Sequence, residues 1–174
     1  MQNDHELIKE YQDGDRSAFD KIVRRHLSNT IGFFFNITGD RMAAEDLAQD
    51  VFFKLYKHLK NFRFEASFTT FLYRVNLNTA NSWLTRNKWK NFLHLDQTPD
   101  RGARDTDVED EWSRKELWGA IARLPNKQRS VVMMRIAQEL PYKDIADMTG
   151  MSEGSAKVNF HHALKTLKKW LNNE

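Results

Sequence analysis

The sequence predicts an all-α protein: two small helical domains joined by a flexible acidic linker, the C-terminal domain being a helix-turn-helix. Three observations support this fold class. Apolar residues recur at helical spacing along most of the chain, no stretch alternates apolar and polar residues as a strand does, and one acidic segment interrupts the pattern. A chain of 174 residues is long enough for two compact helical domains.

Helical stretches separated by two turns are predicted in the first part of the chain. Asp13-Gly14-Asp15 and Gly39-Asp40 each place an acidic N-cap before a helix. The stripe between these turns contains Ala18, Ile22, Val23, Leu27, Ile31, Phe34 and Phe35. The stripe after Asp40 contains Ala44, Leu47, Ala48, Val51, Phe52, Leu55 and Leu59. A loop over Asn61 to Ala66 and a long helix from about Ser67 to Lys90 are predicted next.

The segment from His94 to Glu111 has a different composition. It contains seven acids, two arginines, one proline and one glycine, and few large apolar residues. Such a segment is solvated and self-repelling, which is typical of a linker. We therefore predict one domain over residues 1–92, a linker over 93–110 and a second domain over 111–174.

Four helices are predicted in the second domain. They run approximately over Glu109–Arg123, Lys127–Ala137, Tyr142–Met148 and Ser152–Leu171. Pro141 suits the start of a helix, and Gly150 suits a left-handed turn after one. The last two helices therefore have the layout of a helix-turn-helix, whose second helix enters the major groove of DNA.

The apolar face of this pair predicts which side chains are left for DNA. Ile145, Ala146, Met148 and Met151 should pack against the side chains of Ala156, Phe160, Ala163, Leu164 and Leu167. The candidates for contact with the minus-thirty-five DNA are Ser155, Lys157, Asn159, His162 and Lys165. Asn159 suits an adenine edge and the lysines suit phosphates. The alternative is that the pair is an ordinary part of a helical bundle.

A family resemblance emerges from these motifs. Leu124-Pro125-x-Lys127-Gln128-Arg129, followed by Tyr142-x-x-Ile145-Ala146 and by Gly150-x-Ser152-x-Gly154-Ser155-x-Lys157, resembles the minus-thirty-five reading domain of extracytoplasmic-function (ECF) sigma factors of the sigma-70 family. The chain departs from the family in its second helix, where Asn159, His162 and Leu164 stand at positions that are commonly arginine.

The resemblance continues upstream. Gly39-Asp40 and Ala44-Glu45-Asp46-Leu47-x-Gln49-Asp50-x-Phe52 are similar to the family's core-polymerase-binding helix. One side of that helix carries the polymerase-binding candidates Asp46, Gln49, Asp50, Phe53 and Lys57. The resemblance implies that this side docks on the clamp of the polymerase; the alternative is a solvated face of mixed charge.

The sequence from Phe68 to Val75, followed by Asn78, resembles the family's promoter-melting helix, with Phe71 where tryptophan is usual. Strand separation needs aromatic faces that replace base stacking and cations that follow the backbone. The minus-ten candidates are Arg63, Phe64, Ser67, Phe68, Arg74, Asn78, Arg86 and Lys88. Phe71, Leu72 and Val75 are expected to be buried, and the resemblance implies that the 61–67 loop holds a flipped base.

Composition excludes several other classes of protein. The chain has no cysteine, so it forms no disulfide and no thiolate metal site. No apolar run approaches the ~18 residues of a membrane span, which predicts a cytoplasmic protein without a membrane insertion. The acid pairs around Asp46 lack a nearby nucleophile, and the side chains of His161 and His162 diverge by about 100° on a helix. We therefore expect no enzyme activity, no cofactor and no metal site.

The function expected from this resemblance is that of a sigma factor. Its partners would be core RNA polymerase, through the beta' clamp and the beta flap, promoter DNA, and an anti-sigma factor that holds it inactive. Two alternatives remain. One is a sigma mimic that binds an anti-sigma factor as a decoy without binding DNA; the other is an ordinary helix-turn-helix repressor, which leaves the first ninety residues without a role.

Overall fold

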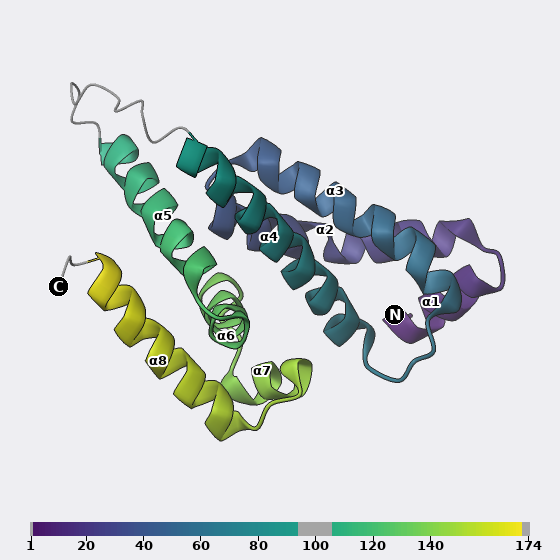
Figure 1. Cartoon of the computed structure of the whole chain (residues 1–174). Coiled ribbons are helices and arrows are strands. Elements are labelled where there is room, and N and C mark those ends of the chain that lie inside the picture. Colours follow the sequence, from purple (N-terminus) through teal and green to yellow (C-terminus); the bar gives the residue numbers. More distant parts are fainter. Residues whose placement is uncertain (1, 94–105, 172–174) are drawn as a thin grey trace. The chain divides into compact units, whose positions relative to one another are not determined.

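The computed structural model describes residues 2–93 and 106–171, and the side chains of 2–86 and 114–171. All secondary structure in these ranges is helical (Figure 1). The helices are α1 (Asp4–Gln12), α2 (Arg16–Thr38), α3 (Arg41–His58), the short 3₁₀ helix η1 (Leu59–Asn61), α4 (Phe68–Leu93), α5 (Thr106–Arg123), α6 (Asn126–Ala137), α7 (Tyr142–Thr149) and α8 (Glu153–Leu171).

The chain divides into two compact units, residues 1–79 and 80–174, and the division falls within α4. Most of the predicted linker lies outside the described residues. Helix α5 begins at Thr106, three residues before the predicted start. None of the described helices combines the length and the apolar character that a membrane crossing requires.

Short polar side chains set the ends of the helices in the first unit, as the sequence predicts. The carboxylate of Asp15 accepts a hydrogen bond from the backbone N–H of Ser17, and that of Asp40 accepts one from Met42, both at 2.9 Å. Gly39 ends α2 in the left-handed region, with φ of 69°, where a side chain is disfavoured. These contacts satisfy the backbone groups that a helix end leaves unpaired.

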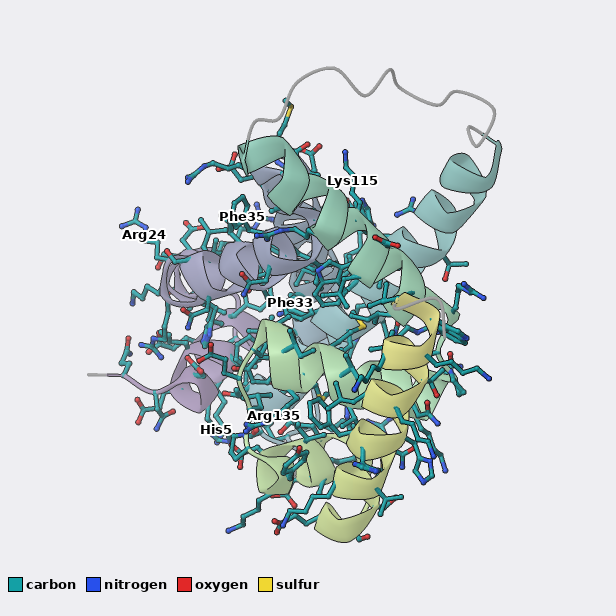
Figure 2. The ribbon with its side chains drawn as sticks, turned by 90° about the vertical axis from the view of Figure 1, so that its left-hand side faces the viewer. His5, Arg24, Phe33, Phe35, Lys115 and Arg135 are labelled. Atoms are coloured by element: carbon teal, nitrogen blue, oxygen red, sulfur yellow. The ribbon has the colours of Figure 1, made fainter. Side chains whose placement is uncertain are left out.

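Packing in the first unit corrects the predicted stripe of α2. Phe33 is buried, whereas Phe35 is 41% exposed and Leu27 is 36% exposed (Phe33 and Phe35 are labelled in Figure 2). The buried residues of α2 are Ala18, Phe19, Ile22, Thr30, Phe33, Phe34 and Ile37. Both faces of α2 carry apolar residues, and its packing against α1 and α3 decides which face is buried. All seven residues of the predicted second stripe, from Ala44 to Leu59, are buried.

In the second unit, α8 packs on α5, α6 and α7, and α7 and α8 form the predicted helix-turn-helix (Figure 1). Gly150 ends α7 with φ of 70°. The hydroxyl of Ser152 accepts a hydrogen bond from the N–H of Ser155 at the start of α8. Ile145, Ala163 and Leu167 are buried as predicted, but Leu164 is 43% exposed. The prediction for Leu164 was wrong because α8 packs on its neighbours through the side that carries Ala163 and Leu167, and Leu164 lies outside that contact.

Candidate nucleic-acid and protein interfaces

The outer side of α3 presents the five polymerase-binding candidates, and all five are exposed: Asp46, Gln49, Asp50, Phe53 and Lys57. Phe53 is 59% exposed although it is a large apolar residue. The ammonium of Lys57 lies 4.2 Å from the centre of the Phe53 ring, within the range of a cation–π contact. The arrangement gives α3 two carboxylates, an amide and an aromatic face on one side, and its buried stripe on the other.

The loop between η1 and α4 has an unusual backbone. Phe64 has φ of 57°, in the left-handed region that residues other than glycine rarely adopt. Its ring packs on Phe62 with a centroid distance of 5.0 Å, and Phe62 packs on Phe71 of α4 at 5.1 Å. The Ser67 hydroxyl accepts a hydrogen bond from the N–H of Thr70 at the start of α4. The loop is therefore tied to α4 by aromatic packing and by an N-cap.

Helix α1 holds the same loop from the opposite side, which the sequence did not reveal. The side-chain amide of Gln12 donates hydrogen bonds to the backbone carbonyls of Leu59 and Phe62, both at 2.9 Å. The ring of His5 packs on Phe64 with a centroid distance of 4.2 Å. These contacts join residues about fifty to sixty positions apart, so neither periodicity nor local motifs could have found them.

A cavity of about 500 Å³ opens between the beginning of α1 and this loop. Its walls include Asn3, His5 and Ile8 on one side, and Phe64, Glu65 and Ser67 on the other. The volume falls in the ~300–1,000 Å³ range of small-ligand pockets. The walls combine aromatic faces with polar edges.

The structure changes the expectation for Phe68. Phe68 is only 6% exposed and packs edge-on against His26, at a centroid distance of 5.2 Å, so its ring is not free to stack on a base. The expected burial is found for Leu72, whereas Phe71 and Val75 are half-buried. Exposed minus-ten candidates are Arg63, Ser67, Arg74, Asn78 and Arg86, and Phe64 is half-buried. Lys88 lies in α4, and its side chain is outside the described ones.

The minus-thirty-five candidates lie along α8. Lys157, His162 and Lys165 are exposed, and Ser155 and Asn159 are half-buried. The amide nitrogen of Asn159 donates to the backbone carbonyl of Ser155 at 2.8 Å and lies 3.3 Å from the Ser155 hydroxyl, so both of its N–H groups have acceptors on α8. Asn159 would have to exchange these bonds before its amide nitrogen could contact an adenine edge, the role that the sequence predicts for it.

The ring of Tyr142, at the start of α7, connects the two helices of the motif. The guanidinium of Arg135 (labelled in Figure 2) lies 5.1 Å from the ring centre, and Phe160 of α8 packs edge-on at 5.8 Å. The ammonium of Lys157 lies 5.9 Å from the same ring and 2.8 Å from the Glu153 carboxylate. The bond to Lys157 holds the pKa of Glu153 below its usual range. Lys157 is therefore held at the N-terminal end of α8, where a groove-binding helix meets DNA.

No three histidine, aspartate or glutamate side chains come together as a metal-binding group among residues that the structure describes. The acids around Asp46 lie on the exposed side of α3. The interfaces described above are surfaces for binding, and their side chains supply hydrogen bonds, charge and aromatic faces.

Two family models match the chain, in order. The model for Sigma-70 region 2 matches residues 22–90, and the model for Sigma-70, region 4 matches residues 114–167. Together they include α3, the loop, most of α4, all of α7 and α8 up to Leu167.

Curated relatives match along almost the whole chain. The RNA polymerase sigma-H factor of Pseudomonas aeruginosa is 27% identical over 98% of this chain and 95% of its own length. The ECF RNA polymerase sigma-E factor of Haemophilus influenzae is 29% identical over 95% of this chain and 93% of its own length. The ECF RNA polymerase sigma factor SigW of Bacillus subtilis is 26% identical, covering 94% of each chain.

Solved structures share the fold. CnrH, in complex with the cytosolic domain of CnrY, superposes with a TM-score of 0.62 at 17% identity, covering 97% of this chain and 96% of that one. The sigma factor RpoE of Bartonella quintana, in complex with the anti-sigma factor NepR, superposes with a TM-score of 0.50 at 18% identity, covering 88% of this chain and 96% of that one.

Proposed function

The chain belongs to the ECF group of the sigma-70 family of transcription initiation factors, and from this premise we propose how its own residues direct RNA polymerase to promoters. The observation that carries the function is that both sigma regions occur in order, in a chain that matches sigma factors over nearly its full length. Sigma factors bind core RNA polymerase and promoter DNA. In this chain, the two tasks fall on different surfaces.

The exposed side of α3 binds core polymerase. Asp46, Asp50 and Gln49 give this side acceptors for basic groups of the beta' clamp, and Phe53 gives it an aromatic anchor. Aromatic residues that are exposed alone but buried in a complex commonly supply most of the binding energy of an interface. Residues 1–92 form the domain that carries this surface.

The loop and α4 bind the minus-ten element. Arg63, Arg74 and Arg86 are exposed and provide charge along the DNA backbone, with Lys88 beside them in sequence. Ser67 and Asn78 provide hydrogen-bonding groups next to a separated strand. The burial of Phe68 against His26 removes it from this set.

Helix α8 binds the minus-thirty-five element in the major groove. Lys157 and Lys165 contact phosphates, and Ser155, Asn159 and His162 face base edges. Residues 111–174 form this domain, joined to the first by the acidic segment over 93–110. The beta flap of polymerase is its second partner.

Regulation by an anti-sigma factor, in the bacterial cytoplasm, completes the proposal. The structures of CnrH and of the Bartonella RpoE hold such partners, and the present chain shares their fold. Bacterial RNA polymerase and its promoters lie in the cytoplasm, and the partner proteins require the same compartment.

The decoy function is a second candidate because of two exposed apolar residues on α8. Val158 is 55% exposed and Leu164 is 43% exposed, and α8 lacks the arginines common in the family. Such residues suit a protein partner as well as the methyl group of thymine. The aromatic and basic groups of the loop and α4 favour the sigma function, because a decoy has no use for them.

Transcription with purified core RNA polymerase tests the proposal directly. Fragments of a bacterial genome are transcribed over many rounds with and without the protein, and the RNA starts are mapped. Discrete new starts that share paired upstream elements are expected. No new starts, together with no co-elution of protein and core polymerase, would favour the decoy.

A further inference from the structure

We propose that Val158 is a specificity residue of this chain, whose two methyl groups contact the 5-methyl group of one thymine in the major groove of the minus-thirty-five element. The inference rests on the proposed sigma function and adds to it a residue and the base that this residue selects. Val158 is not among the residues that the sequence predicts for this interface. The observation that carries the inference is an apolar side chain, 55% exposed, on the outer side of a helix rich in lysine and histidine.

The first step is the direction in which Val158 points. Ala156, Ala163 and Leu167 are the buried residues of α8, which packs on α5, α6 and α7. At about 100° per residue, the middle of this buried side lies about 160° around the helix from Val158, which leaves Val158 about 20° from the outermost direction. Val158 therefore faces away from the core of the second unit.

The second step is that the turn before Val158 leaves its methyl groups accessible. Side chains of a helix point back toward its N-terminus, so Val158 covers the surface beside Gly154, one turn earlier. Gly154 is exposed, and an added Cβ there would meet nothing within 4 Å among the described residues. A base edge can therefore approach Val158 from the N-terminal end of α8, the end that a recognition helix presents to base edges.

The third step is that the charge around Val158 favours DNA as the ligand. The exposed side chains of Lys157, Lys165 and Lys168 lie on the same outer half of α8. Glu153 is the only acid in the sequence of α8, and its carboxylate is paired with Lys157. Lysines attract the phosphate backbone, whereas protein interfaces are depleted of lysine. An apolar side chain among such lysines suits the methyl group of thymine better than a protein partner.

The fourth step is that the side chain next to Val158 is poorly placed to read a base by hydrogen bonding. The amide nitrogen of Asn159 lies 2.8 Å from the carbonyl oxygen and 3.3 Å from the hydroxyl of Ser155, so its N–H groups have acceptors within α8. Valine has no hydrogen-bonding group and distinguishes base pairs by apolar contact alone. The 5-methyl group of thymine is the apolar group that a base presents in the major groove.

The test measures initiation by the full-length protein with core polymerase on a promoter taken from the mapped starts. Each thymine of the minus-thirty-five element, on either strand, is replaced in turn by deoxyuridine, which removes the 5-methyl group and keeps every hydrogen-bonding group. The variants are Val158→Ala, Val158→Ile and the matched control Leu164→Ala, which shortens another exposed apolar side chain of α8. Leu164 lies about 120° around the helix from Val158 and so faces away from the same base.

The wild type should initiate about fourfold more slowly when one particular thymine is replaced by deoxyuridine, because burial of one methyl group is worth about that factor. Val158→Ala should reduce this difference to less than about twofold, since most of the apolar contact is lost. Val158→Ile should retain the difference because it keeps both branches at Cβ, and Leu164→Ala should show the wild-type difference. Co-elution with core polymerase should be the same for all variants.

Three results would overturn the inference while leaving the sigma function standing. The first is a wild type that initiates equally well after every replacement by deoxyuridine. The second is a Val158→Ala variant that keeps the wild-type ratio between the two templates; with an unchanged rate, that ratio is what a protein-binding role of Val158 predicts. The third is an equal loss of the difference in Leu164→Ala. A wild type that produces no starts would instead overturn the proposed function and the inference together.

Discussion

At the scale of single residues, the most informative side chains are those whose exposure conflicts with their chemistry. Phe53 is a large apolar residue on the outside of α3, and Phe68 is an aromatic residue expected on the DNA-binding surface but enclosed by the fold. A sequence pattern assigns residue types to a face, but exposure depends on what packs there. The structure therefore favours Phe53 as a residue that binds a partner, and it makes Phe68 a residue of the core of the first unit.

Replacement of Phe53 by alanine tests its role as an anchor. Because the ring is 59% exposed, we expect the free energy of unfolding to change by less than about 0.5 kcal/mol. The affinity for core polymerase should fall at least about tenfold, as for an aromatic residue that becomes buried in an interface. Fluorescence anisotropy of the labelled protein with core polymerase measures the affinity. Phe35→Ala, at another exposed phenylalanine, is the matched control and should bind as the wild type does.

At the scale of elements, helix ends determine where this chain turns, and a glycine at a helix end should respond to substitution in the opposite way from a glycine inside a helix. Gly150, in the turn of the helix-turn-helix, has φ of 70°, whereas Gly119 lies inside α5. An added Cβ meets nothing within 4 Å at either position, so only the backbone conformation distinguishes them. Gly150→Ala should lower the free energy of unfolding by about 1–2 kcal/mol, and Gly119→Ala should raise it by about 0.5–1 kcal/mol. Urea unfolding of both variants measures this, and equal effects would contradict the explanation.

The N-cap of α2 predicts a dependence on pH. The hydrogen bonds from Ser17 hold the pKa of Asp15 below its usual range. Its contribution to stability is therefore fully present above the ordinary aspartate pKa of about 3.9 and is lost as the pH falls through the lower folded value. Asparagine caps a helix equally well but does not titrate in this range. The stability of the wild type relative to Asp15→Asn should therefore fall between pH 6 and pH 2, and a constant difference in thermal unfolding would argue against the role of the charge.

At the scale of the whole molecule, two units with separate cores predict separate unfolding. Trp83 and Trp89 lie in α4, which crosses the division between the units, so both are first replaced by phenylalanine. The fluorescence of the three remaining tryptophans then reports on the second unit, while far-ultraviolet circular dichroism reports on both. Leu55 is fully buried in the first unit, and Leu55→Ala should destabilise it by about 2–5 kcal/mol. We expect part of the circular dichroism transition to move and the fluorescence transition to stay. Leu167→Ala, in the second unit, should move the fluorescence transition. Joint movement of both signals in either variant would show that the units unfold as one.

The sequence by itself determined the helical class, the positions of most helix ends, the buried stripe of α3 and the membership of the sigma-70 family. These properties depend on residues close together in the chain: N-caps such as Asp15 and Asp40, the left-handed glycines, and apolar spacing within one helix. The bounds and the buried residues of α1 were not predicted, because nine residues form too short a helix to be stable alone and this one depends on packing against α2 and η1.

The tertiary structure decided which face of α2 is buried, that Phe68 is enclosed, that Asn159 uses its amide nitrogen within α8, and that His5 meets Phe64. The buried face of α2, the enclosure of Phe68 and the contact of His5 with Phe64 depend on helices that meet only after the chain has folded. The rotamer of Asn159 is set by its neighbours on α8. Periodicity fixes the side of a helix on which a residue lies, but not what that side will face. The cavity beside His5 exists for that reason only in the folded first unit, where two segments about sixty residues apart form its walls.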